Sequence, residues 1–137
     1  MKLIHEDIFK IYYENTDSSG FTYHTSYLCF AERARSNMLN EKFPETSILL
    51  KQNSYFFVIK RLQTDFYKPS YLYDNLKVLT YFKNSSKCSL NLVQELIKEN
   101  ISICKICLCL VWINGKTKRP TRIPSNLISR FNSGEIV

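Results

Sequence analysis

The second half of the chain is a series of long β-prone runs with short polar breaks between them. The runs cover residues 55–67, 76–82, 89–98 and 101–113. Because the breaks are too short to hold a crossover helix, neighbouring strands are predicted to be antiparallel. Asn114-Gly115 predicts a turn after the last run.

The first half adds one amphipathic helix. Residues 27–39 have helical spacing, with Thr25 and Ser26 as candidate N-caps. A strand is predicted at residues 9–13 and a short second helix at 48–50. The order strand, helix, then four strands predicts an α+β fold in which a helix covers one face of an antiparallel sheet. The apolar face of that helix is expected to consist of Tyr27, Phe30, Ala31, Ala34 and Met38.

Length and composition favour one globular domain spanning residues 1–137, with 45% hydrophobic and 23% charged residues. The sequence has no apolar run of membrane-spanning length and no signal-peptide core at its start, so a cytoplasmic location is expected. The net charge of +7 favours anionic partners. Charge by itself leaves phosphorylated small molecules, acidic proteins and nucleic acids open.

The spacing of two cysteines resembles part of a metal site, but their expected place in the fold argues more strongly against one. Cys104 and Cys107 have the spacing of half a zinc site. They fall on a predicted strand, where they would point to opposite faces of the sheet, and no second pair completes the ligand set. The chain has five cysteines, which is an odd number, and its sequence shows no secretion signal. They are therefore expected to be free thiols rather than disulfides or zinc ligands.

The stretch from Ile11 to Arg35 carries the candidate chemistry. It runs from a predicted strand through a polar turn, which contains Asp17 and His24, into the predicted helix. A carboxylate in such a turn lies near backbone N–H groups that the helix leaves unpaired. A base or nucleophile beside such donors suits attack on an acyl group. The alternative is that Asp17 stabilises the turn and does nothing else.

Residues 12–35, written Y-Y-E-x-T-D-x-x-G-x-x-Y-H-x-x-Y-L-x-F-x-E-x-A-R, resemble the signature of the hotdog-fold acyl-CoA thioesterases. The nearest branch is the 4-hydroxybenzoyl-CoA thioesterase or YbgC-like family. FFVIKRLQTDFYKPSYLYDNLKV and GKTKRPTRIP further along extend the resemblance. Where the family often has Ala-Gly or Gly-Gly after the acidic residue and Val-Val before the Tyr-His pair, this chain has Ser18-Ser19-Gly20 and Phe21-Thr22.

The resemblance implies a hotdog fold, in which an antiparallel β-sheet wraps around one long central α-helix. It implies a homodimer or homotetramer with active sites at subunit boundaries. It also implies an acyl-CoA thioester hydrolase in which Asp17 is the general base or nucleophile and the backbone N–H of His24 is the oxyanion donor. The hydroxyls of Tyr13 and Tyr23, which flank the turn, are candidates to hold Asp17 or line the acyl pocket. Simple core packing is the alternative for both tyrosines.

Coenzyme A is part of the substrate in this interpretation, and no metal or redox cofactor is expected. Its phosphates need cationic partners, and the same positive surface suits acyl carrier protein. A non-catalytic hotdog module that binds acyl carrier protein or another acidic partner is the alternative function. A nucleic-acid-binding domain is disfavoured because the aromatic residues alternate with aliphatic ones, as core residues do. The candidate phosphate ligands are Lys60, Arg61, Lys118, Arg119 and Arg122.

Overall fold

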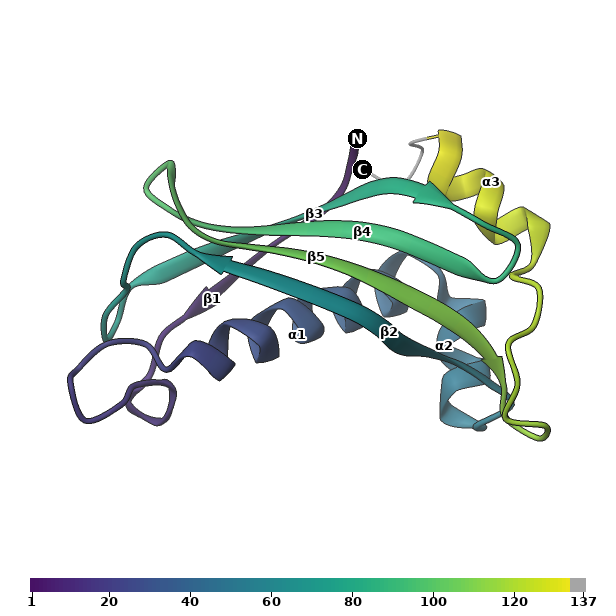
Figure 1. Cartoon of the computed structure of the whole chain (residues 1–137), viewed down its shortest axis with the longest axis horizontal. Coiled ribbons are helices and arrows are strands. Elements are labelled where there is room, and N and C mark those ends of the chain that lie inside the picture. Colours follow the sequence, from purple (N-terminus) through teal and green to yellow (C-terminus); the bar gives the residue numbers. More distant parts are fainter. Residues whose placement is uncertain (134–137) are drawn as a thin grey trace.

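A curved antiparallel sheet forms the body of the protein (Figure 1). The computed structural model describes residues 1–133. The five strands lie in the order β1-β3-β4-β5-β2, and each neighbouring pair is antiparallel, as predicted. The two edges of the sheet are therefore β1 and β2. The strands are β1 (Lys2–Lys10), β2 (Tyr55–Phe66), β3 (Asn75–Ser85), β4 (Ser89–Lys98) and β5 (Ile101–Asn114).

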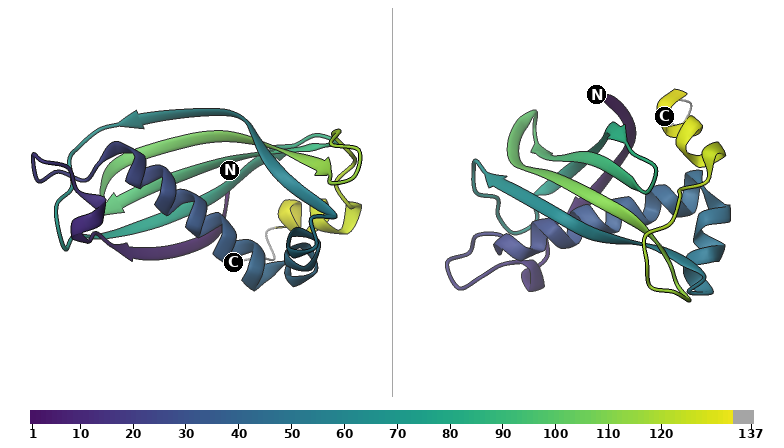
Figure 2. Two further views of the ribbon diagram at one scale, coloured as in Figure 1. Left: turned by 90° about the horizontal axis from the view of Figure 1, so that it is seen from below. Right: turned by 45° about the vertical axis from the view of Figure 1, so that its right-hand side comes forward.

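The core lies between the sheet and helix α1 (His24–Lys42), which runs along the concave side of the sheet (Figures 1 and 2). The predicted apolar face of the helix is confirmed, because all five of its residues are buried. Ala31 and Ala34 have no exposed surface, and their small side chains allow close approach to the sheet. On β5 the side chains that alternate toward α1 are also buried: Cys104, Ile106, Leu108, Leu110 and Trp112.

The helix begins earlier than its apolar spacing predicts, and the predicted caps are wrong. Tyr23 occupies the N-cap position and makes no side-chain cap hydrogen bond. The hydroxyl of Ser26 instead donates to the backbone carbonyl of Asn15, 3.1 Å away. The start of α1 is thus held by tertiary contacts with the preceding segment.

The predicted strand at residues 9–13 is also wrong in its bounds. Strand β1 pairs with β3 and ends at Lys10, and Tyr13–Asn15 form a short 3₁₀ helix. The predicted helix at 48–50 is a longer element, α2 (Pro44–Lys51). Pro44 is the first residue of this helix, a position where proline is tolerated.

Helix α3 (Ser125–Ser133) has no counterpart in the prediction. Its two buried side chains are Leu127 and Phe131. The ring of Phe131 stacks against those of Phe43 and Phe82, at centroid distances of 4.7 and 5.4 Å. The helix therefore closes the end of the core that lies beside α2.

One buried polar cluster ties α1 to the middle of the sheet. Arg35 donates to the side-chain oxygen of Gln94 at 2.8 Å. The amide nitrogen of Gln94 donates to the carbonyl of Ala31 and the hydroxyl of Thr80, each at 3.0 Å. Burial lowers the pKa of Arg35, and the nearby charge of Glu32 opposes that shift. The acceptor for the Arg35 guanidinium is thus a neutral amide on β4 and not the nearer carboxylate of Glu32.

The turn after β5 is confirmed and depends on a glycine. Asn114 ends β5, and a Cβ atom added at Gly115 would lie 1.8 Å from the carbonyl oxygen of Asn53. The expected facing of the two central cysteines is also confirmed, because Cys104 is fully buried and Cys107 is half-exposed. Burial raises the pKa of Cys104 to about 12. Among residues 1–133, no helix is both long and apolar enough to cross a membrane.

Candidate active site

Asp17 lies in a tight turn whose backbone bonds fix its position. The N–H of Asp17 donates to the carbonyl of Phe21 at 2.9 Å, and the N–H of Gly20 donates to the carbonyl of Asp17 at 3.1 Å. Gly20 has a φ of +86°, a conformation that favours glycine over any other residue. The predicted turn is therefore confirmed for Asp17, and it holds the carboxylate on the surface just before α1. The prediction is wrong for His24, which belongs to α1.

Within residues 1–133, Ser19 supplies the hydrogen bonds to the Asp17 carboxylate. The Oδ1 atom accepts from the Ser19 N–H at 2.8 Å and from the Ser19 hydroxyl. These bonds lower the pKa of Asp17, and the bond from the Ser19 hydroxyl has the largest effect. The backbone of Phe21 and the charge of His24 also lower this pKa, while burial raises it. The carboxylate is thus ionised at neutral pH, as both a base and a nucleophile must be.

The first turn of α1 places a backbone donor in the same pocket as this carboxylate. His24 is the first residue of the helix, so its N–H has no acceptor within the helix. The preceding N–H, that of Tyr23, donates to the carbonyl of Asn15 at 2.7 Å, which anchors the helix start. Because the positive end of the helix dipole lies here, negative charge is stabilised at this point.

Asp17 and His24 line the same open groove, which has a volume of about 380 Å³. Aromatic rings form much of its wall. The ring of Phe66 lies 6.3 Å from that of His24 and 5.9 Å from that of Tyr27, measured between centroids. The groove thus combines a carboxylate, a helix N-terminus and an apolar wall. Its other lining residues are Phe21, Thr22, Tyr67, Lys68 and Pro69.

The two flanking tyrosines lie outside this lining. Tyr13 is 82% exposed, and in the described part of the chain its hydroxyl makes no hydrogen bond to Asp17. It is the carbonyl of Tyr13 that has a structural use, because it accepts from the N–H and hydroxyl of Thr16 at 3.1 and 2.8 Å. The ring of Tyr23 contacts that of His24 at 4.5 Å, beside the groove.

A single copy of the chain does not bring the predicted phosphate ligands to Asp17. All five cations are exposed and none of them lines the groove that contains Asp17. Lys60 and Arg61 lie in the middle of β2. Lys118, whose ammonium lies 5.5 Å from the centre of the Phe56 ring, belongs to the segment that follows β5. Figure 1 shows that segment at the lower right and the turn before α1 at the lower left, at opposite ends of the sheet. Sequence reasoning missed Lys68, the cation that does line the groove.

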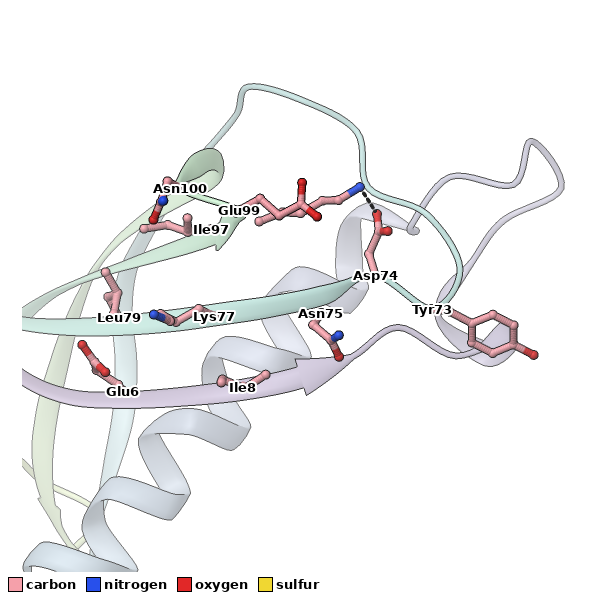
Figure 3. Close-up of a pocket in the computed structure, with 11 residues that line it drawn as sticks. Glu6, Ile8, Tyr73, Asp74, Asn75, Lys77, Leu79, Ile97, Glu99 and Asn100 are labelled. Atoms are coloured by element: carbon pink, nitrogen blue, oxygen red, sulfur yellow. Dashed lines mark ion pairs between the residues drawn. The ribbon is translucent and has the colours of Figure 1, made fainter.

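A second hollow, of about 470 Å³, lies near the other edge of the sheet (Figure 3). It is lined by residues from β1, β3, β4 and their loops, including Glu6, Lys77 and Glu99. The Lys98 ammonium and the Asp74 carboxylate form an ion pair of 2.9 Å at one end of it. Since its charges are of both signs and its lining includes no residue of the Asp17 turn or the start of α1, we place the candidate chemistry in the smaller groove.

The sequence matches the thioesterase-like superfamily over residues 13–131. The chain belongs to this superfamily. It is 28% identical over 124 residues to an acyl-CoA thioester hydrolase YbgC of Escherichia coli O6:H1, covering 89% of this chain and 91% of that one. It is 38% identical over 87 residues to an acyl-CoA thioesterase YbgC of Helicobacter pylori, covering 64% of this chain and 62% of that one.

Solved thioesterase structures share the fold of this superfamily member. A thioesterase from Thermus thermophilus, complexed with coenzyme A and zinc, superimposes with a TM-score of 0.83, at 21% identity, over 98% of this chain and 96% of that one. The hotdog fold and the classification as a thioesterase, both predicted from the sequence, are thereby confirmed. The roles of the individual site residues stay predictions.

Proposed function

We propose that the chain hydrolyses acyl-CoA thioesters, with Asp17 as the catalytic carboxylate and the N–H of His24 as the oxyanion donor. The observation that carries the proposal is that both residues line one groove with an apolar wall. The names of the relatives from Escherichia coli and Helicobacter pylori support the choice of substrate.

The reaction needs one activated oxygen and one stabilised negative charge. As a general base, Asp17 takes a proton from water while the water oxygen attacks the thioester carbonyl; as a nucleophile, its own oxygen attacks and water then opens the resulting anhydride. In both routes the negative charge that develops on the carbonyl oxygen is stabilised by the N–H of His24. When this charge returns to the carbonyl, the C–S bond breaks and the thiolate leaves as coenzyme A. The free acid forms in that step when Asp17 is a base, and when water opens the anhydride if Asp17 is the nucleophile. Neither route uses a resident metal or redox cofactor.

We further propose that the catalytic unit is a homodimer joined along β2. This strand is an edge of the sheet, so one side of its backbone is free to pair. Three of its apolar side chains point toward the α1 side of the sheet, yet Ile59 is 45%, Leu62 37% and Phe66 50% exposed. A second copy would cover this row.

Antiparallel pairing of two β2 strands would also complete the substrate site. It brings the Tyr55 end of one β2 next to the Phe66 end of the other. The basic segment after β5, which lies beside the Tyr55 end through the β2–β5 pairing, would then face the partner's Asp17 groove. Lys118, Arg119 and Arg122 of one copy are thus proposed to bind the coenzyme A phosphates, or the acidic surface of acyl carrier protein, beside the groove of the other.

The catalytic proposal is tested with a panel of acyl-CoA and acyl-carrier-protein thioesters, following the released thiol. Wild type is expected to turn over at least one acyl-CoA, and Asp17→Asn is expected to lose that turnover while still folding. Glu14→Gln is the matched control, because Glu14 is an exposed carboxylate three residues earlier in the same segment. Equal losses in the two variants would contradict the assignment of Asp17.

The dimer proposal is tested by sedimentation of Leu62→Asp beside Ile8→Asp. Ile8 is 62% exposed on β1, the opposite edge of the sheet. Leu62→Asp is expected to yield monomers with a raised KM for acyl-CoA, whereas Ile8→Asp remains dimeric. A Leu62→Asp protein that stays dimeric, or a monomer with wild-type KM, would contradict the proposal.

The non-catalytic alternative has one observation in its favour. In a single copy the basic segment lies far from Asp17. This separation is expected of a surface that binds an acidic partner and takes no part in catalysis. A purified protein that binds acyl carrier protein but hydrolyses no member of the thioester panel would establish this function in place of catalysis.

A further inference from the structure

A fully buried serine lies directly behind the candidate groove. Ser70, in the loop between β2 and β3, is 0% exposed and does not line the groove. Its hydroxyl lies 2.6 Å from the hydroxyl of Thr22 and 2.7 Å from that of Tyr27. Its carbonyl accepts the N–H of Thr22 at 2.8 Å. One side chain thus holds the other two by hydrogen bonds that water does not reach.

These contacts join Ser70 to two nearby positions that lie 48 and 43 residues earlier in the sequence. Thr22 follows the turn that carries Asp17, while Tyr27 lies in the first turn of α1, where His24 offers its N–H. Ser70 holds both at once. A buried hydroxyl without a partner is costly, so each of the three groups keeps the other two in place.

The Ser70 loop is itself anchored to the sheet. The N–H of Tyr71 donates to the carboxylate of Asp74 at 2.8 Å. The same carboxylate forms the ion pair with Lys98 that is visible in Figure 3. The ring of Tyr71 also contacts that of Phe21, with centroids 5.4 Å apart. The loop therefore holds Ser70 in a fixed position, and Ser70 in turn holds the Asp17 turn and the start of α1 in place.

We propose that Ser70 is a positioning residue for thioester hydrolysis, which fixes the Asp17 carboxylate relative to the His24 N–H through Thr22 and Tyr27. This inference rests on the proposed function, since it assigns the catalytic roles to those two groups. Ser70 does not contact substrate. It acts on the geometry of the pair, and a displacement of about 1 Å between reacting groups can slow an enzyme by about 100-fold.

The experiment compares kcat, KM and the pH profile of wild type and Ser70→Ala on the acyl-CoA that the panel identifies. We expect kcat to fall by about 10- to 100-fold with KM within about twofold of wild type. The groups on Ser19 and Phe21 that lower the pKa of Asp17 lie inside its own turn, so the acidic limb of the profile is expected to stay in place. A merely destabilising change would lower the folded fraction, which thermal unfolding by circular dichroism measures at the assay temperature.

Ser129→Ala is the matched control. The hydroxyl of this exposed serine on α3 donates to the carbonyl of Asn126 at 3.1 Å, so the variant also removes one serine hydrogen bond. It is expected to keep wild-type kcat and KM. A folded Ser70→Ala protein with the kcat of this control would overturn the inference.

Two further variants separate the possible failures. If Asp17→Asn retains turnover, the proposed function fails; if it loses turnover while folded Ser70→Ala keeps wild-type kcat, only the positioning role fails. Should Ser70→Ala not fold, Tyr27→Phe removes the other end of the same hydrogen bond without emptying the core. A folded Tyr27→Phe protein with lowered kcat would support the inference, and one with wild-type kcat would overturn it.

Discussion

Replacement of Gln94 by Leu tests the buried polar cluster at the centre of the fold. Gln94 accepts one hydrogen bond from Arg35 and donates two, to the Ala31 carbonyl and the Thr80 hydroxyl. Arg35 is 8% exposed, and among residues 1–133 Gln94 is its hydrogen-bond acceptor. The substitution therefore leaves a buried guanidinium without a hydrogen-bond acceptor among these residues.

The expected loss of stability follows from these contacts. A hydrogen bond to a charged group contributes about 1.5–3 kcal/mol and a neutral one about 0.5–1.5 kcal/mol. Burial of the added apolar side chain offsets part of this loss. The free energy of unfolding should therefore fall by about 3–5 kcal/mol, the range seen when a buried charge loses its partner. Urea unfolding, followed by circular dichroism at one fixed protein concentration, measures this quantity.

Two controls make the result interpretable. Gln52→Leu, at an exposed position directly after α2, should change stability by less than about 0.5 kcal/mol. The double variant Arg35→Met with Gln94→Leu should be more stable than Gln94→Leu, because it removes the orphaned charge as well. The reasoning is refuted if Gln94→Leu lies within about 1 kcal/mol of wild type, or if the double variant is the less stable of the two.

Three further outcomes are expected. Ser19→Ala should shift the acidic limb of the kcat/KM profile to higher pH, because it removes the hydroxyl contact that most lowers the pKa of Asp17; an unmoved limb would contradict that cause. Gly115→Ala should lower the unfolding free energy by about 1–3 kcal/mol, since its Cβ would meet a backbone oxygen at 1.8 Å; an unchanged urea midpoint would contradict this. At pH 8 a thiol reagent should modify exposed Cys29 and leave Cys104 intact, because burial raises the pKa of Cys104 to about 12; fast labelling of Cys104, located by mass spectrometry, would contradict the burial.

The sheet could be predicted from the sequence because its signals are local. Each long β-prone run is bounded by its own polar break, and the run at 89–98 coincides with β4. The turn that carries Asp17 was predictable for the same reason, since its polar residues and Gly20 are consecutive. The apolar face of α1 repeats with helical spacing, which a sequence displays directly.

Features that depend on distant partners could not be predicted. The start of α1 is set by the contact between Ser26 and Asn15 and has no capping side chain. Arg35 and Gln94 are 59 residues apart, so no local pattern in the sequence identifies them as partners. The position of the phosphate-binding candidates is a property of the sheet order, which puts the segment after β5 at the far end from Asp17.

The central claim is that the Asp17 carboxylate carries out the hydrolysis. The most direct test is the single-turnover rate of acyl-CoA hydrolysis by Asp17→Asn, measured by rapid quench with enzyme in excess over substrate. Because the amide can neither accept a proton from water nor attack the carbonyl, the account predicts a rate lower by about 100-fold or more. A folded Asp17→Asn protein that hydrolyses the thioester within about threefold of the wild-type rate would contradict it.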